Sequence, residues 1–451
     1  MKSAIVMAAG KGTRMKSELT KTMHQILDRP MIQHVYDNLK KAKVDEIVVV
    51  VGYGAEQIKN HLKDKVEYAL QEPQLGTGHA VMQAKMLKGK EGKTLLYNGD
   101  CPLIQPKTIE KLFEKANEAE FTILTTRIPD PLKYGRIIRD GYGNVEKIVE
   151  FKDCNNEELA INEINVGIYC VDNELLWKYI DELDNNNAQK EYYVTDLVEI
   201  FKKHGHTVNA MTADDFDEMI GPNDRVMLAK ATDWLKNKLN TNLMENGVTL
   251  IDPSSVYVST DTSVGEDSVI YPNVTMEGKV SIGNNCTILP NTFLKDVCIG
   301  DGCVIDSSRI TDSKIGNDVT IGPNSHLRNG CEIADKVRIG NFVELKNTKF
   351  GYNTKCAHLT YIGDTIVGEK VNFGCGVVTV NYDGKNKFKT EIGDGAFIGS
   401  NVNIIAPVKI GKRALLAAGS TINEDVDDGD MGIARVRQEN KKGFGEKYKD
   451  K

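Results

Sequence analysis

The sequence predicts two folds in series, an α/β domain followed by a parallel β-helix. A six-residue repeat runs from about Ile251 to about Ile422, with an apolar residue at every sixth position that is most often followed by Gly and then Asn or Asp. Period six fits neither an amphipathic helix nor an alternating strand. It fits short strands that turn every six residues, with Gly, Asn or Asp at corners that need a positive φ.

Stacked coils of this kind would place each apolar residue on its equivalents above and below, which forms a thin continuous core. The clearest repeats begin at Val264, Ile282, Ile315, Ile339, Ile392, Ile398 and Ile410. The alternative is an all-β sandwich in which Val-Gly and Ile-Gly pairs are scattered by chance.

The first 225 residues alternate between short apolar runs and helix-like segments, which predicts a sheet with crossover helices. Strands are expected at 2–7, 46–51, 93–97 and 121–125, and helices at 31–41, 78–87 and 106–117. Leucines at helical spacing and a stop at Gly247 predict a connecting helix at 226–247. The expected division is therefore 1–225, the helix 226–247, the repeat domain 248–423 and a C-terminal tail 424–451.

The composition of the chain excludes some classes of function. The chain has 451 residues, 40% apolar and 27% charged, which is ordinary for a soluble protein of two or three domains. A net charge of −7 argues against a chain-wide nucleic-acid surface, and no apolar run of about 18 residues marks a membrane span. Nine cysteines without a CxxC pair indicate free thiols. We expect a cytoplasmic protein with neither nucleic-acid nor membrane partners.

Phosphate chemistry is predicted where the first strand runs into the small, Gly-rich segment 8–14. Backbone N–H groups at such a turn face an anion, and Arg14 and Lys21 add positive charge. A second apolar run ends at Asp100, which places a carboxylate at the sheet's carboxyl edge, where ligands and Mg²⁺ bind. Taken singly, each feature has a simpler explanation: an ordinary turn for the loop, and a turn or N-cap aspartate for Asp100.

Several motifs carry a family resemblance. The segment 8–15 (Ala-Ala-Gly-Lys-Gly-Thr-Arg-Met) followed by Lys21 resembles the signature of sugar-1-phosphate nucleotidylyltransferases. The similarity continues in order through Gln71, Gln-Leu-Gly-Thr-Gly-His at 74–79, Asn-Gly-Asp at 98–100, Tyr-Gly-Arg at 134–136, Glu150, Asn165 and Gly-Pro-Asn at 221–223. The six-residue repeat resembles the left-handed parallel β-helix of hexapeptide-repeat acyltransferases.

Up to about Arg437, the chain resembles the family of bifunctional N-acetylglucosamine-1-phosphate uridylyltransferases and glucosamine-1-phosphate N-acetyltransferases. The resemblance implies a Rossmann-like nucleotidyltransferase domain followed by a left-handed β-helix. It implies an enzyme that acetylates glucosamine 1-phosphate with acetyl-CoA and then transfers UMP from UTP to N-acetylglucosamine 1-phosphate with release of pyrophosphate. The product, UDP-N-acetylglucosamine, would be a precursor of peptidoglycan and lipopolysaccharide.

At the first site, the resemblance implies that Arg14 and Lys21 neutralise phosphate charge. Mg²⁺ would be held by Asp100 and Asn223, whose two oxygens are completed by water and phosphate. The nucleotide and sugar ligands would be Ala8, Ala9, Gly10, Lys21, Gln71, Gly76, Thr77, Gly135, Glu150, Asn165 and Asn223. Thr20 departs from the pattern, because relatives usually have Pro before the lysine.

Polar residues interrupt the repeat between 345 and 387, and the resemblance implies an acetyltransferase site there. His358 would be the general base that removes a proton from the amine, whereas alone it would be interpreted as a satisfied or solvated histidine. The glucosamine phosphate would contact Arg328, Lys346, Tyr361, Asn372 and Lys387, and acetyl-CoA would contact Cys375, Asn381, Tyr382, Ser400, Ala418 and Arg435. Cys375 is a departure, since relatives often carry Ala. A homotrimer is also implied, with this site shared between subunits.

The sequence leaves two other functions open. One is a nucleotidylyltransferase whose β-helix only oligomerises or regulates, and the polar constellation from His358 to Lys387 argues against it. The other is a hexapeptide-repeat scaffold with a degenerate nucleotide pocket, which the intact Gly10, Lys21 and Asp100 argue against.

Overall fold

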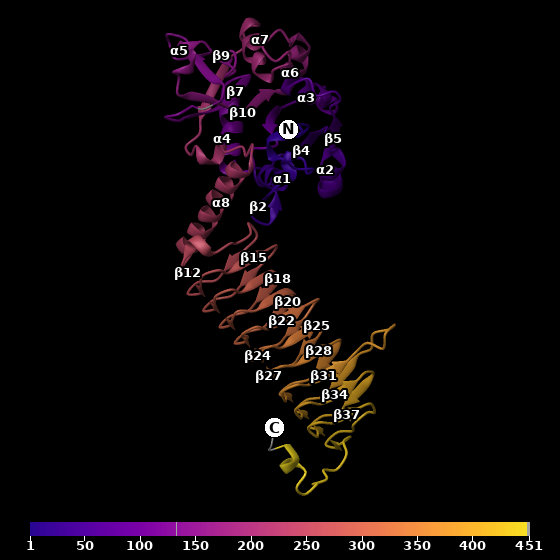
Figure 1. The fold of residues 1–451 in the computed structure, drawn as a ribbon. Coiled ribbons are helices and arrows are strands. Elements are labelled where there is room, and N and C mark those ends of the chain that lie inside the picture. The colour runs from indigo at the N-terminus through magenta and orange to yellow at the C-terminus, as the bar shows by residue number, and fades with distance from the viewer. Residues whose placement is uncertain (132, 449–451) are drawn as a thin grey trace. The chain divides into compact units, whose positions relative to one another are not determined.

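The computed structural model describes residues 1–131 and 133–448 and separates into two compact units, Met1–Leu235 and Lys236–Lys451. The first is an α/β domain and the second a parallel β-helix, as the ribbon shows (Figure 1). The boundary falls inside helix α8 (Arg225–Glu245), which occupies the predicted connecting segment. Residues 449–451 of the predicted tail lie outside the described residues. The predicted fold class is confirmed.

Among the described residues, a mixed sheet of nine strands forms the centre of the first unit, and its main path is β11-β7-β10-β6-β1-β4-β5. Strands β1, β4, β5 and β6 are parallel, while β10 runs antiparallel to β6, β7 and β8. The strands are β1 (Lys2–Met7), β4 (Glu46–Val51), β5 (Glu67–Leu70), β6 (Lys93–Asn98), β7 (Phe121–Arg127), β8 (Arg136–Arg139), β9 (Val145–Val149), β10 (Glu163–Asp172) and β11 (Val208–Thr212). A short hairpin, β2 (Gln25–Ile26) and β3 (Arg29–Pro30), stands apart.

Helices cover both faces of this sheet because consecutive residues of its central strands are apolar and point alternately to the two faces. Ala4 and Val6 of β1 belong to one core, to which α1, α2 and α4 contribute, and Ile5 belongs to the other, to which α3, α6 and α7 contribute. The helices are α1 (Met31–Lys41), α2 (Ala55–Leu62), α3 (Thr77–Gln83), α4 (Pro106–Lys115), α5 (Asn156–Leu159), α6 (Asn173–Tyr179) and α7 (Leu197–Lys203). A strand buried on both faces is typical of a parallel sheet between helix layers.

The second unit stacks short parallel strands on three faces. The first face has β12 (Thr249–Leu250), β14 (Val269–Ile270), β17 (Thr287–Ile288), β19 (Val304–Ile305), β21 (Thr320–Ile321), β24 (Arg338–Asn341), β27 (Lys355–His358), β30 (Asn372–Phe373), β33 (Phe397–Ile398), β36 (Leu415–Leu416) and β38 (Met431–Gly432). The second has β15 (Thr275–Glu277), β22 (His326–Arg328), β25 (Glu344–Lys346), β28 (Tyr361–Gly363), β31 (Val378–Val380), β34 (Asn403–Ile405) and β37 (Thr421–Ile422).

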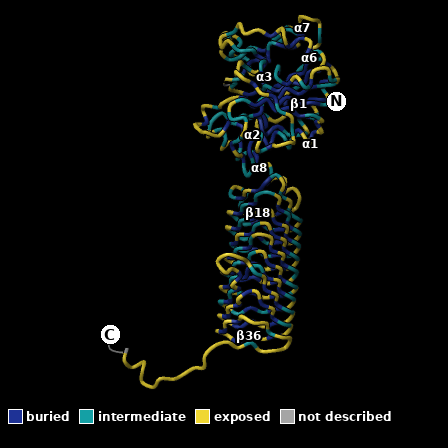
Figure 2. The backbone as a smooth tube through the Cα atoms, turned by 90° about the vertical axis from the view of Figure 1, so that its right-hand side faces the viewer, coloured by how far each residue is buried: buried dark blue, intermediate teal, exposed yellow. Residues whose placement is uncertain are grey.

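The third face has β13 (Ser263–Val264), β16 (Ser281–Ile282), β23 (Glu332–Ile333), β26 (Lys349–Phe350), β29 (Thr365–Val367), β32 (Thr390–Ile392) and β35 (Val408–Ile410). Two longer strands, β18 (Phe293–Ile299) and β20 (Arg309–Ile315), pass from the second face to the third. Buried residues line the inside of the coils along their whole length (Figure 2).

Equivalent apolar residues stack in register inside the β-helix. Ile270, Ile288, Ile305, Ile321 and Ile339 are successive partners on the first face, and all five are fully buried. Successive members are 18, 17, 16 and 18 residues apart. The full six-residue period is therefore kept in the 18-residue coils, and the shorter coils drop one or two residues without disturbing the core.

The glycine of each Ile-Gly-Asn-Asp repeat serves a different purpose from the one predicted. The positive φ lies two residues further on, at Asn285 (55°) and Asp318 (56°). A Cβ on Gly283 would instead meet the Asp301 side chain at 2.2 Å and backbone of the next coil at 2.7 Å. Gly283 is therefore required by close coil-to-coil approach, and Asn or Asp takes the left-handed corner.

No helix in the described ranges is both long enough and apolar enough to span a membrane.

A buried carboxylate ties three strands of the first unit together. Glu163 on β10 accepts hydrogen bonds from Arg139 Nε (2.8 Å) and Nη2 (2.6 Å) on β8 and from Thr125 Oγ1 (3.0 Å) on β7. Burial opposes ionisation of Glu163, but the hydrogen bonds and charge of Arg139 outweigh it and lower its pKa. The ion pair therefore fixes β8 against β10.

We expect Glu163→Gln to destabilise the first unit by about 1–3 kcal/mol, because Arg139 loses a charged acceptor. A folded-state pKa below the ordinary 4.5 stabilises the fold above that pH, and this contribution is lost as pH falls through the folded value. The free-energy difference between wild type and variant, measured by urea unfolding, should thus be full at neutral pH and shrink in acid. A difference that is constant with pH would contradict this account.

Two candidate active sites

A cavity of about 470 Å³ opens at the carboxyl edge of the first unit's parallel strands. Its walls come from the loops that follow β1, β5 and β6 and from the start of α3. In a parallel α/β sheet this edge is where ligands bind. The lining residues are Met7, Ala8, Ala9, Gly10, Gly12, Arg14, Lys21, Thr22, Gln71, Gln74, Gly76, Thr77, Ala80, Asn98, Asp100, Glu191 and Asn223.

Gly12 holds the Gly-rich turn against Lys21. Its φ is +64°, in the left-handed region, and a Cβ at this position would lie 2.5 Å from Lys21 Cβ. Only glycine therefore allows the turn and the lysine to pack this closely.

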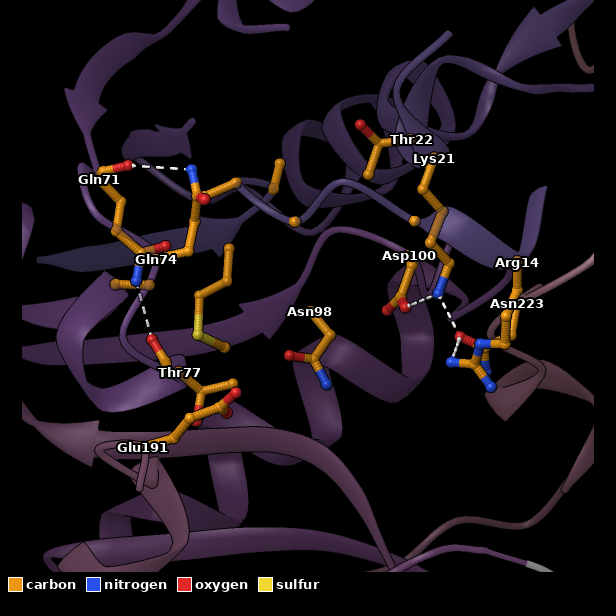
Figure 3. A pocket seen from close by; sticks show the side chains of 17 residues that line it. Arg14, Lys21, Thr22, Gln71, Gln74, Thr77, Asn98, Asp100, Glu191 and Asn223 are labelled. Atoms are coloured by element: carbon orange, nitrogen blue, oxygen red, sulfur yellow. Dashed lines mark hydrogen bonds and ion pairs between the residues drawn. The ribbon is translucent and has the colours of Figure 1, made fainter. Parts of the chain in front are cut away.

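Four charged or polar side chains converge at one end of the cavity (Figure 3). Lys21 Nζ donates to Asp100 Oδ2 and, at 2.6 Å, to Asn223 Oδ1. Arg14 Nη2 donates to the same Asn223 oxygen at 2.8 Å. Residues more than 200 positions apart in sequence thus meet here, and two oxygens point at one cation.

The opposite end of the cavity is shaped by Gln71 and Thr77. The buried Gln71 donates from Nε2 to the Gly76 carbonyl at 2.9 Å, and Gly76 itself has a φ of +109°. Thr77 begins α3 and accepts from the Val194 backbone N–H at 3.0 Å. These contacts fix the backbone and amide groups along this wall.

A second cavity of about 290 Å³ shares Thr77, Asn98, Asp100 and Asn223 with the first. Its other lining residues are Cys101, Lys133, Tyr134, Gly135, Glu150, Asn165, Val166, Gly167, Tyr169, Val194, Thr195, Met219 and Gly221. The two cavities therefore meet at Asp100 and Asn223, and every first-site residue predicted from sequence lines one of them.

Glu150 and Asn165 are held in place within the second cavity. Burial, with a smaller effect from the Asp153 charge, raises the pKa of the Glu150 carboxyl. Asn165 donates from Nδ2 to the Tyr169 hydroxyl at 2.7 Å and accepts from the Gly167 N–H at 3.0 Å. Its backbone N–H also donates to Gly135 O at 2.9 Å, which joins these two residues.

The first cavity's donor set fits a hard divalent cation. Asp100 and Asn223 present two oxygens to a single positive group, and Mg²⁺ in nucleotide sites is commonly bound by one or two protein oxygens plus water and phosphate. Within the described residues there is no cluster of three or more His, Cys, Asp or Glu side chains that could hold a metal by themselves.

In the β-helix, His358 lies in a column of corner residues. His358 is the register partner of Asn341 on the preceding coil, and its Nδ1 is 3.3 Å from Asn341 Oδ1. Three corner hydrogen bonds continue the column: Gly376 N to Leu359 O (3.1 Å), Asn401 N to Cys375 O (2.7 Å) and Gly419 N to Ser400 O (2.9 Å). The column so formed is Asn341, His358, Cys375, Ser400 and Ala418, of which the last four are exposed.

Arg435 also lies by this column, since its Cδ is 3.7 Å from the position of a Cβ on Gly419. Its neighbour Ala434 donates from the backbone to Ser420 Oγ at 3.1 Å. The structure thus brings Cys375, Ser400, Ala418 and Arg435 onto the same edge as His358.

A basic cluster forms at the far end of the second-face strands. Arg328 and Lys346 are register partners, and Arg328 donates to Glu344 Oε1 from Nε (2.9 Å) and Nη2 (2.6 Å). The nearby Lys387 ammonium lowers the pKa of Lys346, with desolvation adding to the effect. Lys387 reaches this position on a short hairpin, closed by its bridge to Tyr382.

Four further predicted residues lie outside the column and the basic cluster. Asn372 lies on the first face, paired with Lys355 and Phe397. Asn381 donates to Asp364 Oδ2, and Tyr382 donates from its hydroxyl to Gly384 O at 2.6 Å within the hairpin. Tyr361 begins β28, the strand that follows the His358 corner.

Sequence reasoning missed several residues of these sites, and four of them matter most for the geometry. Glu191 and Thr22 line the first cavity, while Asn341 and Glu344 are the partners of His358 and Arg328. Asn341 could have been found from the coil length, because it precedes His358 by one coil of 17 residues. Glu191 follows a long irregular segment, and nothing in its neighbourhood marks it as a cavity residue.

Comparison with known proteins identifies the family. Residues 3–235 match the nucleotidyl transferase model, and 261–296, 312–347 and 389–424 match the bacterial transferase hexapeptide model of six repeats. The Bifunctional protein GlmU of a Geobacillus species is 52% identical over 98% of this chain and 97% of its own, and that of Exiguobacterium is 50% identical over 98% of each chain. The chain belongs to the GlmU family.

A solved UDP-glucose pyrophosphorylase complexed with UDP-glucose covers 53% of this chain and 99% of its own, at 20% identity and a TM-score of 0.43. This similarity is too low to carry a conclusion.

As a member of this family, the protein is a bifunctional enzyme that combines a nucleotidyltransferase with a hexapeptide-repeat acetyltransferase. The predictions of family, fold and bifunctional activity are confirmed, and the two rival functions are wrong.

Gly12→Ala should lower nucleotidyl transfer at least about tenfold, because the added Cβ displaces Lys21 and tenfold corresponds to about 1.4 kcal/mol of barrier. The measurement is pyrophosphate release. Gly89→Ala is the matched control: its φ is also positive, at +80°, but a Cβ there meets nothing within 4 Å. Equal losses in both variants would attribute the effect to backbone strain and exclude a specific role of Lys21 packing.

Proposed function

We propose that the first unit transfers UMP from UTP to N-acetylglucosamine 1-phosphate and that the β-helix acetylates glucosamine 1-phosphate with acetyl-CoA. One observation carries the first assignment: two cavities that meet at Asp100 and Asn223, beside Lys21 and Arg14. A nucleotide in the larger cavity and a sugar phosphate in the smaller one would have their phosphates at this junction.

In uridylyl transfer, an oxygen of the sugar phosphate attacks the α-phosphorus of UTP. The new P–O bond forms as the bond to the β-phosphate oxygen breaks, and pyrophosphate leaves with that electron pair. Lys21 and Arg14 would neutralise the negative charge gathered at the junction and align the phosphates. Asp100 and Asn223 would hold Mg²⁺, which when bound supplies further charge neutralisation.

The walls of the two cavities would set the orientation of the substrates. The uracil would lie between Ala8, Ala9 and Gly10 on one side and Gln71, Gly76 and Thr77 on the other, where fixed amide groups match its donors and acceptors. The sugar would lie against Gly135, Glu150 and Asn165. A carboxylate and an amide that line the same cavity suit sugar hydroxyls and an acetamido group.

In acetyl transfer, His358 would accept a proton from the glucosamine amine as its nitrogen attacks the thioester carbonyl. The C–N bond forms, the C–S bond breaks and CoA leaves as the thiolate, which the proton neutralises. The contact of Nδ1 with Asn341 supports this role, because it orients the imidazole and leaves Nε2 for the substrate.

The phosphate of that substrate would be bound by Arg328, Lys346 and Lys387. Three cations gathered at one place favour a dianion, and the lowered pKa of Lys346 reflects this concentration of charge. Tyr361 and Asn372 would position the sugar. Acetyl-CoA would follow the column from His358 past Cys375, Ser400, Ala418 and Arg435. It would also contact Asn381 and Tyr382 at the hairpin.

The assembly proposed is a cytoplasmic homotrimer without nucleic-acid or membrane partners. A column of exposed corner residues offers little enclosure for a ligand as long as acetyl-CoA. Packing around a threefold axis would form grooves between β-helices, and closed cyclic symmetry is the usual way to satisfy such surfaces.

The two activities should be separable by single substitutions. Asp100→Ala should abolish uridylyl transfer and keep acetylation, and His358→Ala should do the reverse, by at least about 10²-fold if His358 is a general base. Pyrophosphate release and CoA thiol release, measured on the same purified samples, test this directly. Loss of both activities in either folded variant would refute independent sites.

Chelation should distinguish the same two activities. EDTA is expected to abolish uridylyl transfer and to spare acetyl transfer, because only the first site has metal-ligand oxygens in its proposed mechanism. Adding back Mg²⁺ serves as the control. The assignment fails if EDTA stops acetylation while circular dichroism shows an intact fold.

Dissociating the trimer should remove acetylation and leave uridylyl transfer nearly unchanged. A charge placed on the third face by Ile366→Glu, or on the second face by Ile405→Glu, provides the test, because both side chains are half-exposed. Sedimentation would establish the monomer, and both half-reactions would then be assayed. A monomer that acetylates at the wild-type rate would refute an acetyltransferase site shared between subunits.

A further inference from the structure

We propose that the Lys21 ammonium group takes the place of the metal ion in the nucleotide-free enzyme, so that the metal binds tightly only together with a nucleotide that draws Lys21 away. The inference deepens the proposed function and rests on its assignment of Asp100 and Asn223 as the metal ligands.

The contacts of Lys21 are those of a bound cation. Its Nζ donates to Asp100 Oδ2 and to Asn223 Oδ1, the two oxygens of the proposed metal site (Figure 3). The Lys21 side chain is only 12% exposed, against 30% for Asp100. A divalent ion bound by the same two oxygens would lie against the ammonium group, and two positive charges at that distance repel strongly.

Asn223 strengthens the competition. Its Oδ1 accepts from Lys21 at 2.6 Å and from Arg14 Nη2 at 2.8 Å. An amide oxygen has two lone pairs, so both are engaged in this state. A metal ion must therefore displace at least one charged donor before Asn223 can ligate it.

A nucleotide offers Lys21 a better partner. Lys21 packs against Gly12, in the turn whose backbone faces the phosphates in the proposed function. The long lysine stem lets the ammonium group move from Asp100 to a phosphate oxygen by side-chain rotation alone. The nucleotide thus frees both oxygens as it arrives, and linkage requires the metal to favour the nucleotide by the same factor.

The test uses Mn²⁺ alone as the probe, with free ion measured by electron paramagnetic resonance and no nucleotide present. Lys21→Met should bind Mn²⁺ at least about tenfold more tightly than wild type, a coupling of ordinary size. Lys21→Arg keeps the charge and should stay as weak as wild type. Lys85→Met, at an exposed lysine, controls for the change in net charge.

A second substitution separates this inference from the proposed function. Adding Asp100→Asn to Lys21→Met should remove the gain in Mn²⁺ affinity. If the gain survives, the ion binds elsewhere, and both the Lys21 exchange and the assignment of Asp100 as a metal ligand are refuted. If folded Lys21→Met binds Mn²⁺ no more tightly than wild type, the exchange is refuted. In that case the assignment of Asp100 and Asn223 as metal ligands is kept only if Asp100→Asn weakens Mn²⁺ binding measured with UTP present.

Discussion

The β-helix depends on one constraint, that each coil must return the chain to the same register as the coil before it. Backbone hydrogen bonds between coils impose this register, and the fully buried Ile288, Ile305 and Ile321 stack as its consequence. Coils of 16 to 18 residues satisfy it because corners with left-handed residues absorb the difference. The same register acts on the outside, where side chains at equivalent corners form columns. The column that contains His358 is thus a product of the coil repeat.

The first unit reaches its site by a different physical route. Parallel strands β1 and β6 end at the same edge, which brings the Gly-rich turn and Asp100 together. The charged side chains that converge there need partners, and Lys21 finds them in its ion pair with Asp100 and its hydrogen bond with Asn223. The electrostatic arrangement that suits phosphates also holds these four side chains together.

The sequence predicts those features of the structure that depend on residues close together in the chain, and it misses those that depend on contacts between distant residues. The repeat and the strands at 2–7 and 46–51 are local patterns, and β1 and β4 have those bounds. The role of Gly283 was misassigned because close contact between coils is not visible in a single repeat. Strands β8 and β9 are short, and β8 owes its place to Arg139 and Glu163, which are 24 residues apart. Glu191 enters the first cavity only through the tertiary fold.

The basic cluster of the β-helix has a local electrostatic cost, which the proposed phosphate site would explain. Lys346 and Lys387 repel, as the lowered Lys346 pKa indicates, so the hairpin that carries Lys387 needs its own support. Asp383 provides it by accepting from the backbone N–H groups of Lys385 (2.7 Å) and Asn386 (2.6 Å). A phosphate bound between the two ammonium groups would turn their repulsion into attraction without further movement of the chain. Such preorganised charge binds an anion more effectively than lysines that must first be gathered.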